Sequence, residues 1–213
     1  MLNPGHNADN ANNPAVSHRV NVGYGHTNFC DTTGTNTNAG YPEHAFNWDV
    51  SVRIRTILNA HGVKVVMTRP NDTSAGPCIT TRAVIGNRPG VAAVISIHAD
   101  GTASGAGHGF HICEDSRPPA GAKVAALSHS LTVDLHDSVL ASSGFTTSTY
   151  LGRNGYYPRE DFGALNLATV PSTFLELGNM RNAGDAAKQS TAAGRQRIAQ
   201  SVANGILTWL THR

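Results

Sequence analysis

The sequence predicts an α/β fold in which helices cover both faces of a mostly parallel, twisted sheet. First, short apolar runs of strand length alternate with longer segments of helical period. Second, the run VAAVISIHA at 91–99 is apolar almost throughout, as expected of a strand buried on both faces. Third, a chain of 213 residues, 39% of them hydrophobic, is long enough to bury one sizeable core. We therefore expect a single domain over residues 1–213.

The beginning of the chain combines a very short apolar start with a long polar segment. The residues ML before NPGH are too few for a typical buried strand, so we expect a trimmed N-terminus and leave open whether a targeting segment preceded it. Residues 7–42 are rich in Asn, Gly and Thr, and a structureless loop of this length is rare inside a compact domain. Within it, SHRVNVGYG alternates apolar and polar residues. We expect a functional or pinned loop, or a hairpin, inserted after the first strand.

Residues 43–61 fit both the alternation of a strand and the stripe of a helix. Their length, with Pro42 before the segment and Gly62 after it, favours a helix. The other predicted elements are a strand over 63–68, a short helix over 80–88, strands over 91–99 and 108–113, a helix over 120–141, a strand over 171–177 and a closing helix over 192–211. In such a sheet, ligands bind beyond the carboxyl ends of the strands, so polar residues there are the candidates for chemistry.

Composition and charge argue against two classes of partner. The formal net charge is +2 and no block of basic residues is present, so we expect no nucleic-acid partner. No apolar run approaches the roughly 20 residues that span a bilayer, so we expect a chain that does not cross a membrane. The sequence does not define an oligomeric state, and we take a monomer as the default.

Three cysteines are present: Cys30, Cys78 and Cys113. Cys30 and Cys78 lie in loop-like sequence, whereas Cys113 ends an apolar run. Two loop thiols and one buried thiol indicate a Cys30–Cys78 disulfide with Cys113 free, and a disulfide would indicate an oxidising compartment. Three reduced thiols stay an alternative that the number of cysteines does not exclude. A zinc site from His26, Cys30 and Cys78 lacks a fourth ligand and any C-x-x-C spacing, so we prefer the disulfide.

Polar side chains stand at the ends of the apolar runs. His6 follows the first run, His98 lies near the end of the buried run, and Glu176 lies near the end of the last predicted strand. Glu43 opens the long helix, where a carboxylate also suits the helix dipole. Taken alone, His6, His98 and Glu43 each have an ordinary structural explanation. Glu176 does not. A carboxylate buried in an apolar strand is costly without a partner, and a metal or an acid–base role would explain it.

Five segments of the chain together resemble one family of enzymes. They are NPGHN, PEHAFNWDVSVRIRTILNAHGVKVVMTR, RAVIGN, VISIHADG and FLELGNM. In this order, they resemble the zinc-dependent N-acetylmuramoyl-L-alanine amidases of the amidase-3 type. The Cys30 and Cys78 pair and the segment TNTNAGYPEH are most similar to stand-alone secreted amidases of mycobacterial cell envelopes.

This resemblance implies a zinc site and a catalytic carboxylate. The family's Asp-Pro-Gly-His motif, helix-opening glutamate and Ser-Ile-His-Ala motif fall on His6, Glu43 and His98, which would be the zinc ligands. The family's Glu-Leu-Gly motif makes Glu176 the catalytic carboxylate. Three protein ligands leave a fourth position for water, which is the pattern of catalytic sites. Asn3 stands where the family has Asp, and we expect it to orient His6 from behind.

Several other polar residues have assignments of their own. Tyr157, Arg159 and Asp161 lie in a Gly-containing loop before the last predicted strand, which suits either substrate contact or a solvated loop. Arg69 and Arg82 align with family arginines, and we expect them to hold the scaffold through buried hydrogen bonds.

The remaining histidines receive no metal role. His108 and His111 are three residues apart on one predicted strand, so they would face opposite sides of the sheet and are poor joint ligands. His129 and His136 share a helix face but are too far apart for one ion.

The function implied by the resemblance is peptidoglycan hydrolysis. Zinc-dependent cleavage would break the amide bond between N-acetylmuramic acid and the L-alanine of the stem peptide, with a muramyl peptide as substrate. The disulfide and the resemblance imply a secreted protein of the periplasm or cell wall. Two alternatives stay open. A zinc carboxypeptidase-like peptidase would need an arginine pocket that cannot be assigned, and a non-catalytic cell-wall-binding regulator would ordinarily have lost a ligand or the glutamate.

Overall fold

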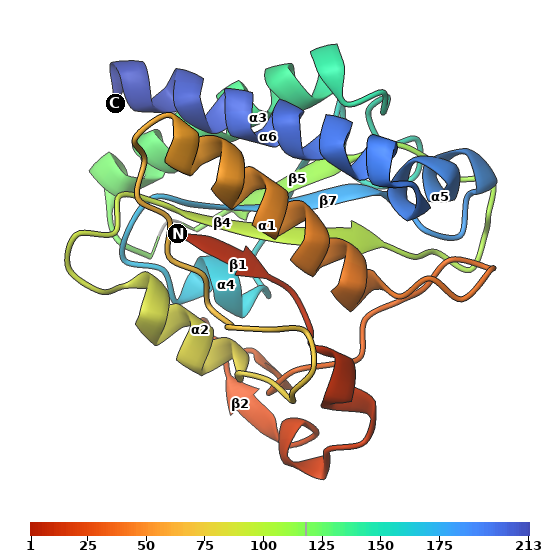
Figure 1. Ribbon diagram of the computed structural model, residues 1–213. Helices are drawn as coiled ribbons and strands as arrows, with labels where there is room; N and C mark the ends of the chain where they lie inside the picture. Colours follow the sequence, from red (N-terminus) through yellow and green to blue (C-terminus); the bar gives the residue numbers. More distant parts are fainter. Residues whose placement is uncertain (118) are drawn as a thin grey trace.

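The computed structural model of the chain, which describes residues 1–117 and 119–213, contains a five-stranded mixed sheet (Figure 1). The strand order is β1–β4–β7–β5–β6. The strands are β1 (Leu2–Pro4), β4 (Val94–Asp100), β7 (Ser172–Asn179), β5 (His111–Asp115) and β6 (Tyr156–Arg159). Neighbouring strands pair in parallel, except that β5 is antiparallel to β7. The predicted α/β class and the mostly parallel sheet are confirmed.

Helices lie on both sides of this sheet. Helices α1 (Glu43–Ala60), α3 (Ala122–Ser142) and α6 (Ala192–His212) pack on one face, and α2 (Ile79–Gly86) and α4 (Gly163–Asn166) lie on the other (Figure 1). The short helix α5 (Ala183–Ser190) precedes α6. Within residues 1–117 and 119–213, every helix is too short or too polar for a transmembrane span.

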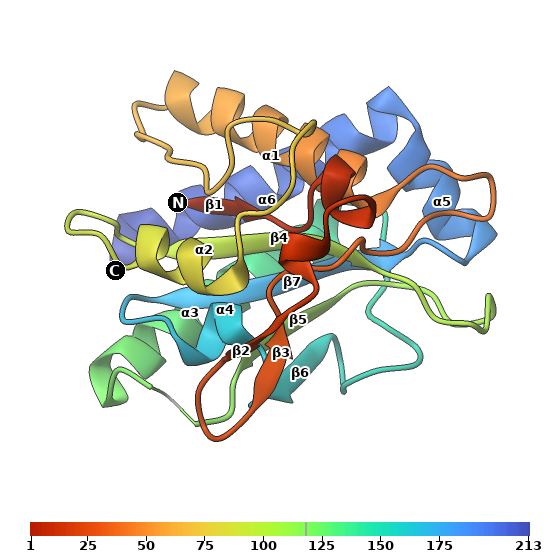
Figure 2. The ribbon, with the colours of Figure 1, turned by 90° about the horizontal axis from the view of Figure 1, so that it is seen from below.

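The segment inserted after β1 contains the predicted hairpin. Its strands are β2 (Arg19–Asn21) and β3 (Thr27–Phe29), which pair in antiparallel fashion. Two single-turn 3-10 helices precede the hairpin, η1 (Ala8–Ala11) and η2 (Pro14–Val16). Figure 2 shows the hairpin on the side of the sheet that α2 and α4 occupy. This polar insertion therefore forms part of the face that carries the candidate site.

Alternation along β4 and β7 separates an apolar face from a polar one. Ile95, Ile97 and Leu175 belong to the main core with α1, α3 and α6, and they are at most 3% exposed. Successive side chains of a strand alternate between the two faces. His98, which follows Ile97, and Glu176, which follows Leu175, therefore point to the opposite face. The face of α2 and α4 therefore receives the polar side chains of both central strands.

One predicted strand is wrong. The segment 63–68 makes a single bridge, between Met67 and Leu2, rather than a regular ladder. It is attached to β1 by hydrogen bonds from Leu2 N to Val66 O (2.9 Å) and from Thr68 N to Leu2 O (3.1 Å). The reason is that β1 has only three residues, too few to support a longer pairing.

Strand β6 and helix α5 are among the elements without a counterpart in the prediction. Strand β6 contains Pro158, which is unfavourable inside a sheet and is tolerated here because β6 is an edge strand. Helix α5 has eight residues, most of them small or polar, so no apolar stripe reveals it.

Candidate metal centre

Three side chains from distant parts of the chain meet at the carboxyl ends of β1 and β4. His6 follows β1, Glu43 is the first residue of α1, and His98 lies in β4. One ligand atom of each lies within 4.8 Å of those of the other two. Glu43 Oε1 is 3.2 Å from His6 Nε2 and 2.9 Å from His98 Nδ1, and the two imidazole centroids are 4.9 Å apart. The structure thus brings together the three residues that the sequence proposes as metal ligands.

The chain path after β1 aims His6 at His98. Strands β1 and β4 are parallel neighbours, and Pro4 pairs with Ile97, so the turn after β1 lies beside the end of β4. His6 has a left-handed backbone conformation, with φ of 57°. Gly5 leaves room for the His98 ring, since a Cβ atom at Gly5 would lie 1.9 Å from His98 Cε1. A residue with a side chain at this position would displace the imidazole.

Glu43 is held by hydrogen bonds from its own helix and from the inserted loop. Its Oε2 accepts a hydrogen bond from the backbone N–H of Thr35 (3.0 Å), and its Oε1 accepts one from Asn47 Nδ2 (3.1 Å) one turn along α1. The residue is only 4% exposed. These bonds fix the carboxylate so that Oε1 faces both imidazoles.

The charges of the cluster favour a cation. Burial disfavours the charged form of Glu43, but His6 and His98 hold the pKa of this carboxyl well below its usual range. Burial also disfavours protonated His6, but Glu43 and Asp31 outweigh it and raise the pKa of His6 to about 10. Burial lowers the pKa of His98, although Glu43 opposes the shift. The two buried carboxylates thus favour positive charge between the imidazoles.

Contacts on the far side of His6 fix its tautomer. His6 Nδ1 donates to the carbonyl oxygen of Thr32 at 2.9 Å, so Nε2 is the ring nitrogen that faces Glu43 and is available to a metal ion. Asp31 Oδ1 lies 3.5 Å from the same Nδ1. The inserted loop therefore supplies the groups that orient this ring. Only the unusual polarity of the 7–42 segment signals such a role in the sequence.

The expectation that Asn3 orients His6 is corrected. Asn3 lies on β1, and its Nδ2 donates to Ser96 Oγ on β4 at 2.9 Å. Its Oδ1 accepts hydrogen bonds from Thr68 Oγ1 (2.8 Å) and Arg82 Nη1 (3.1 Å). The side chain thus joins β1 to its neighbours, because a residue within the strand points across the sheet rather than along the turn that carries His6.

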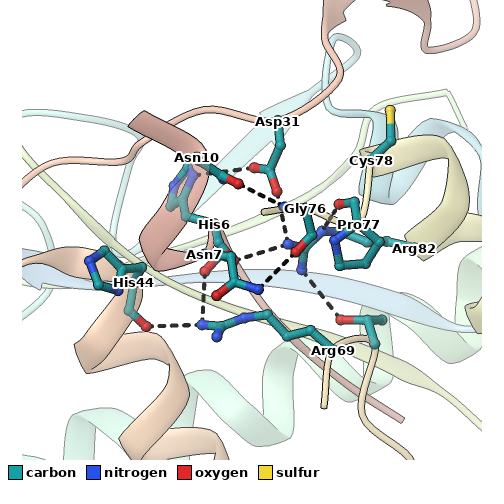
Figure 3. Close-up of polar contacts among 12 residues, drawn as sticks. His6, Asn7, Asn10, Asp31, His44, Arg69, Gly76, Pro77, Cys78 and Arg82 are labelled. Atoms are coloured by element: carbon teal, nitrogen blue, oxygen red, sulfur yellow. Dashed lines mark hydrogen bonds and ion pairs between the residues drawn. The ribbon is translucent and has the colours of Figure 1, made fainter. Parts of the chain in front are cut away.

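Buried arginines support the turn that carries His6, as Figure 3 shows. Arg82 donates to the carbonyl oxygen of His6 (3.0 Å) and to the carboxylate of Asp31 (2.9 Å). Arg69 donates to the carbonyl oxygen of His44 (2.9 Å) at the start of α1. Asp31, between His6 and Arg82, keeps its charge although buried, and its pKa falls to about 2. The predicted role of both arginines in buried hydrogen bonds is confirmed.

Glu176 adds a further, partly buried carboxyl group beside the cluster. It pairs with His98 across β4 and β7, on the same face of the sheet. Its Oε2 is buried and has no hydrogen-bond partner among the described residues. Burial, with the nearby carboxylates of Glu43 and Asp100, raises the pKa of Glu176 well above its usual range. The cluster and Glu176 line one cavity of about 300 Å³.

Aromatic rings connect the cluster to the loop proposed for substrate contact. Phe174 of β7 stacks on His98, with centroids 4.2 Å apart. Phe162 packs against Phe174 at 4.7 Å, and the Arg159 guanidinium lies 4.4 Å from the Phe162 centroid. Arg159 also forms a forked ion pair with Asp161, at 2.7 and 2.6 Å. The three residues proposed for substrate contact pack together in this aromatic group; they are Tyr157, Arg159 and Asp161. The group contacts the metal-ligand cluster through Phe174, which stacks on His98.

The expected Cys30–Cys78 disulfide is not formed in the structure, where Cys30, Cys78 and Cys113 are free thiols. The Cys30 and Cys78 sulfurs are nevertheless neighbours, within 4.8 Å of each other and of a ring nitrogen of His18. A disulfide needs a sulfur–sulfur distance of about 2.05 Å. The two loops therefore meet as predicted without the bond, and the histidine beside the thiols is His18 rather than His26.

The fold and this site define an enzyme of the hydrolase class. Two imidazoles and a carboxylate converge at the ends of parallel strands, and a further, partly buried carboxyl group lies beside them. The family model described as N-acetylmuramoyl-L-alanine amidase matches residues 1–208. The chain belongs to the N-acetylmuramoyl-L-alanine amidase family, as the resemblance of its motifs predicts.

Three mycobacterial relatives are similar over almost the whole chain. The N-acetylmuramoyl-L-alanine amidase Rv3717 of Mycobacterium tuberculosis is 41% identical over 210 residues, which cover 99% of this chain and 85% of that protein. The crystal structure of the amidase Ami1 from Mycobacterium smegmatis has a TM-score of 0.94 and 40% identity, covering 100% of this chain and 96% of that one. The apo form of Ami1 from Mycobacterium abscessus has a TM-score of 0.91 and 44% identity, covering 98% and 96%.

We predict that Gly5→Ala weakens metal binding. The added methyl group would lie 2.2 Å from His98 Nε2, so the imidazole must move away from Glu43. We expect the affinity for a divalent metal to fall by about 10- to 100-fold, measured by competition with a chromophoric chelator. Gly184→Ala in α5, where a Cβ atom meets only Asn182 Oδ1 at 3.2 Å, is the matched control and should bind the metal normally. Equal affinities in the two variants would contradict the close approach of Gly5 to His98.

We predict that Arg82→Met lowers the free energy of unfolding by about 3–5 kcal/mol, because it leaves the Asp31 carboxylate buried without its cationic partner. Urea denaturation followed by circular dichroism measures the change. Arg88→Met, at an exposed position, should alter the free energy of unfolding by no more than about 0.5 kcal/mol. If both variants unfold at the same urea concentration as the wild type, the Arg82–Asp31 pair does not support the turn.

Proposed function

We propose that this enzyme is a zinc-dependent amidase that hydrolyses the bond between N-acetylmuramic acid and the L-alanine of the peptidoglycan stem peptide. The observation that carries the proposal is the convergence of His6, Glu43 and His98 beside Glu176. Membership of the amidase family supports an amide as the bond that is cleaved. It also argues against a carboxypeptidase-like activity, and the presence of all four residues argues against a non-catalytic regulator.

The residues present fit a zinc ion. Two imidazole nitrogens and one carboxylate oxygen form a donor set of catalytic zinc sites, and three protein ligands leave a further position for water or substrate. The hydrogen bond from His6 Nδ1 to Thr32 leaves Nε2 free to coordinate, and the buried carboxylates favour positive charge there. Zinc bound here would lower the pKa of a water molecule and polarise the scissile carbonyl.

Glu176 is the proposed proton carrier. The water oxygen adds to the carbonyl carbon of the lactyl group while the Glu176 carboxylate accepts one water proton. The carbon–nitrogen bond then breaks, and Glu176 returns the proton to the departing amine of L-alanine. The products are the lactyl carboxylic acid and the free amine, so the atoms balance. The position of Glu176 supports this role, because it neighbours His98 and its Oε2 has no other partner among the described residues.

We also propose that Tyr157, Arg159 and Asp161 contact the substrate. Their support is the continuous packing from Arg159 through Phe162 and Phe174 to His98. The Arg159 side chain is 25% exposed and is held in one orientation by its fork with Asp161. A partly exposed guanidinium held in one orientation suits recognition of a peptide carboxylate.

We propose further that the protein is secreted and acts in the cell wall. Peptidoglycan is outside the cytoplasm, and the Cys30 and Cys78 sulfurs lie within 4.8 Å of each other. A small movement of the two loops would allow the disulfide to form in an oxidising compartment. The bond would tie the inserted loop, which orients His6, to the start of α2.

We predict that Glu176→Ala retains zinc but loses hydrolysis, whereas His98→Ala loses both. Removal of the proton carrier should reduce kcat by about 10²- to 10⁴-fold, and removal of a ligand should release the metal. One measurement is zinc content by elemental analysis. The other is the appearance of the free amino group of the stem peptide's L-alanine when muropeptides are cleaved, with and without a chelator. The proposed function is wrong if the wild type cleaves muropeptides equally well after complete removal of the metal, or if Glu176→Ala cleaves them at the normal rate.

We predict one reactive thiol in the protein purified from an oxidising compartment. Under denaturing, non-reducing conditions only Cys113 should react with a thiol reagent, because Cys30 and Cys78 would be joined. Reduction before labelling should expose all three thiols, which mass spectrometry of labelled peptides can assign. Three reactive thiols without reduction would rule out the disulfide and remove one support for secretion.

A further inference from the structure

A second cavity adjoins the metal-ligand cluster on the side of the hairpin. It has a volume of about 130 Å³ and is lined by residues of strand β3 and helix α4, which lie on the same side of the sheet (Figure 2). His6 and His98 line this cavity and also the larger cavity that contains Glu176. The two spaces therefore meet at the proposed metal ligands, and a substrate bound there can place a group in each of them.

Aromatic and aliphatic side chains form much of the wall of the second cavity. Phe29 of β3 contributes a ring, as do Phe162 and Phe174, and Ile79 and Ala164 contribute aliphatic groups. Pockets for small ligands are lined mainly by side chains of these kinds. Phe29 is 43% exposed, so its ring is accessible to a ligand that enters from solvent.

The buried polar residues of the wall are already paired within the protein. Asn3 is bonded to Ser96 Oγ at 2.9 Å and to Arg82 Nη1 at 3.1 Å. Asp31 accepts hydrogen bonds from Arg82 Nη2 at 2.9 Å and from the backbone N–H of Thr32 at 2.8 Å. Because these groups have their partners, the cavity favours an apolar occupant over one that needs new hydrogen bonds.

The volume of the cavity suits one small residue. A dry cavity of about 150 Å³ takes a ligand of the size of benzene. The cavity beside His6 and His98 is slightly smaller, at about 130 Å³. An alanyl residue is similar in size to benzene, whereas a valyl residue is larger by two methyl groups.

The place of the cavity indicates which half of the substrate enters it. Phe162 lies on the wall, and the Arg159 guanidinium is 4.4 Å from the Phe162 centroid. Since Arg159 is the proposed site for a peptide carboxylate, the stem peptide extends from the metal in this direction. The residue that carries the scissile nitrogen is then the one beside His6 and His98.

We propose that this cavity is the subsite for the first residue of the stem peptide, and that Phe29 and Ala164 set its preference for L-alanine. The inference rests on the proposed function, because it takes the amide at the metal as the bond that is cleaved. A glycine in this position leaves part of the cavity empty, and a larger side chain meets the walls formed by β3 and α4. Both changes cost transition-state binding.

A series of substrates tests the subsite in the unaltered, zinc-loaded protein. The probes are N-acetylmuramyl peptides with glycine, L-alanine or L-valine as the first residue. We expect kcat/KM to be highest for L-alanine and at least about 10-fold lower for the other two, since one methyl group in an apolar pocket is worth about that much. Calorimetry with zinc-loaded Glu176→Ala should give the same order of affinities without turnover. Equal kcat/KM values for L-alanine and L-valine overturn the proposal.

Two variants should shift this preference in opposite directions. Phe29→Ala widens the cavity and should raise the ratio of kcat/KM for L-valine over L-alanine by about 10-fold. Ala164→Leu narrows the cavity and should raise the ratio for glycine over L-alanine by a similar factor. A general loosening of the site does not produce opposite shifts. The proposal is overturned if either variant, folded and zinc-loaded, keeps the wild-type ratios, or if both shift toward the same substrate.

Leu140→Ala and Ala187→Leu are the matched controls. Leu140 on α3 is 45% exposed, close to the value for Phe29, and Ala187 is an exposed residue of α5. Both variants should keep all substrate ratios within about twofold of the wild type. Shifts as large as those of Phe29→Ala or Ala164→Leu would show that the ratios respond to any apolar substitution, and would overturn the assignment.

The other half of the substrate also carries a methyl group, on the lactyl ether. Substrates with a glycolyl ether in its place distinguish the two occupants. Phe29→Ala and Ala164→Leu should leave the ratio of lactyl to glycolyl substrates at its wild-type value. A change in this ratio, with the preference for the first residue unaltered, assigns the cavity to the acyl half and overturns the proposal. Failure of the proposed function is recognised separately, because a wild type that cleaves no muramyl peptide, or cleaves it without metal, gives that result before any variant is compared.

Discussion

The site depends on one buried carboxylate, Glu43, that faces two imidazoles at once. A charge that is removed from water costs several kcal/mol unless partners compensate for it. Here the compensation comes from His6, His98 and the N–H groups of Thr35 and Asn47. The partners belong to the turn after β1, to β4, to the inserted loop and to α1 itself, so the burial of Glu43 requires four segments to hold one arrangement. The arginines behind His6 serve the same requirement, because they satisfy the carbonyl groups of the turn that delivers the first imidazole.

Much of the fold can be predicted from periodicity. The long apolar stripes of α3 and α6 and the nearly continuous apolar runs of β4 and β7 specify their type and approximate place, because these elements are buried deeply and their local pattern matches their surroundings. The candidate site is predictable for a related reason. His6, His98 and Glu176 stand at strand ends, where a parallel sheet gathers polar side chains, and family motifs add Glu43 at a helix start.

The features of the fold and site that the sequence does not predict depend on contacts between distant segments, which no local sequence pattern indicates. Nothing in the HGFHIC segment shows that β5 runs antiparallel to β7, yet this orientation decides that His111 stands beside Glu176. The segment 63–68 has a strand pattern but finds only the three residues of β1 to pair with. The partners of His6 come from Asp31 and Thr32, because the polar insertion folds back over the turn after β1, whereas the neighbouring Asn3 points to β4. Each outcome is set by long-range packing, which overrides the local pattern.

The separation of positions 6, 43 and 98 along the chain has a consequence for the lifetime of this enzyme. No local stretch of an unfolded chain offers all three donors, so an ion held by them belongs to the native state alone. Such an ion adds to native stability in proportion to the logarithm of its free concentration. Contacts of this span also form slowly during folding, so a chain that has opened would not regain them quickly. A low metal concentration would then shorten the lifetime of the enzyme as well as lower its turnover. A chain without the bound ion unfolds more often, and proteases cleave the unfolded state.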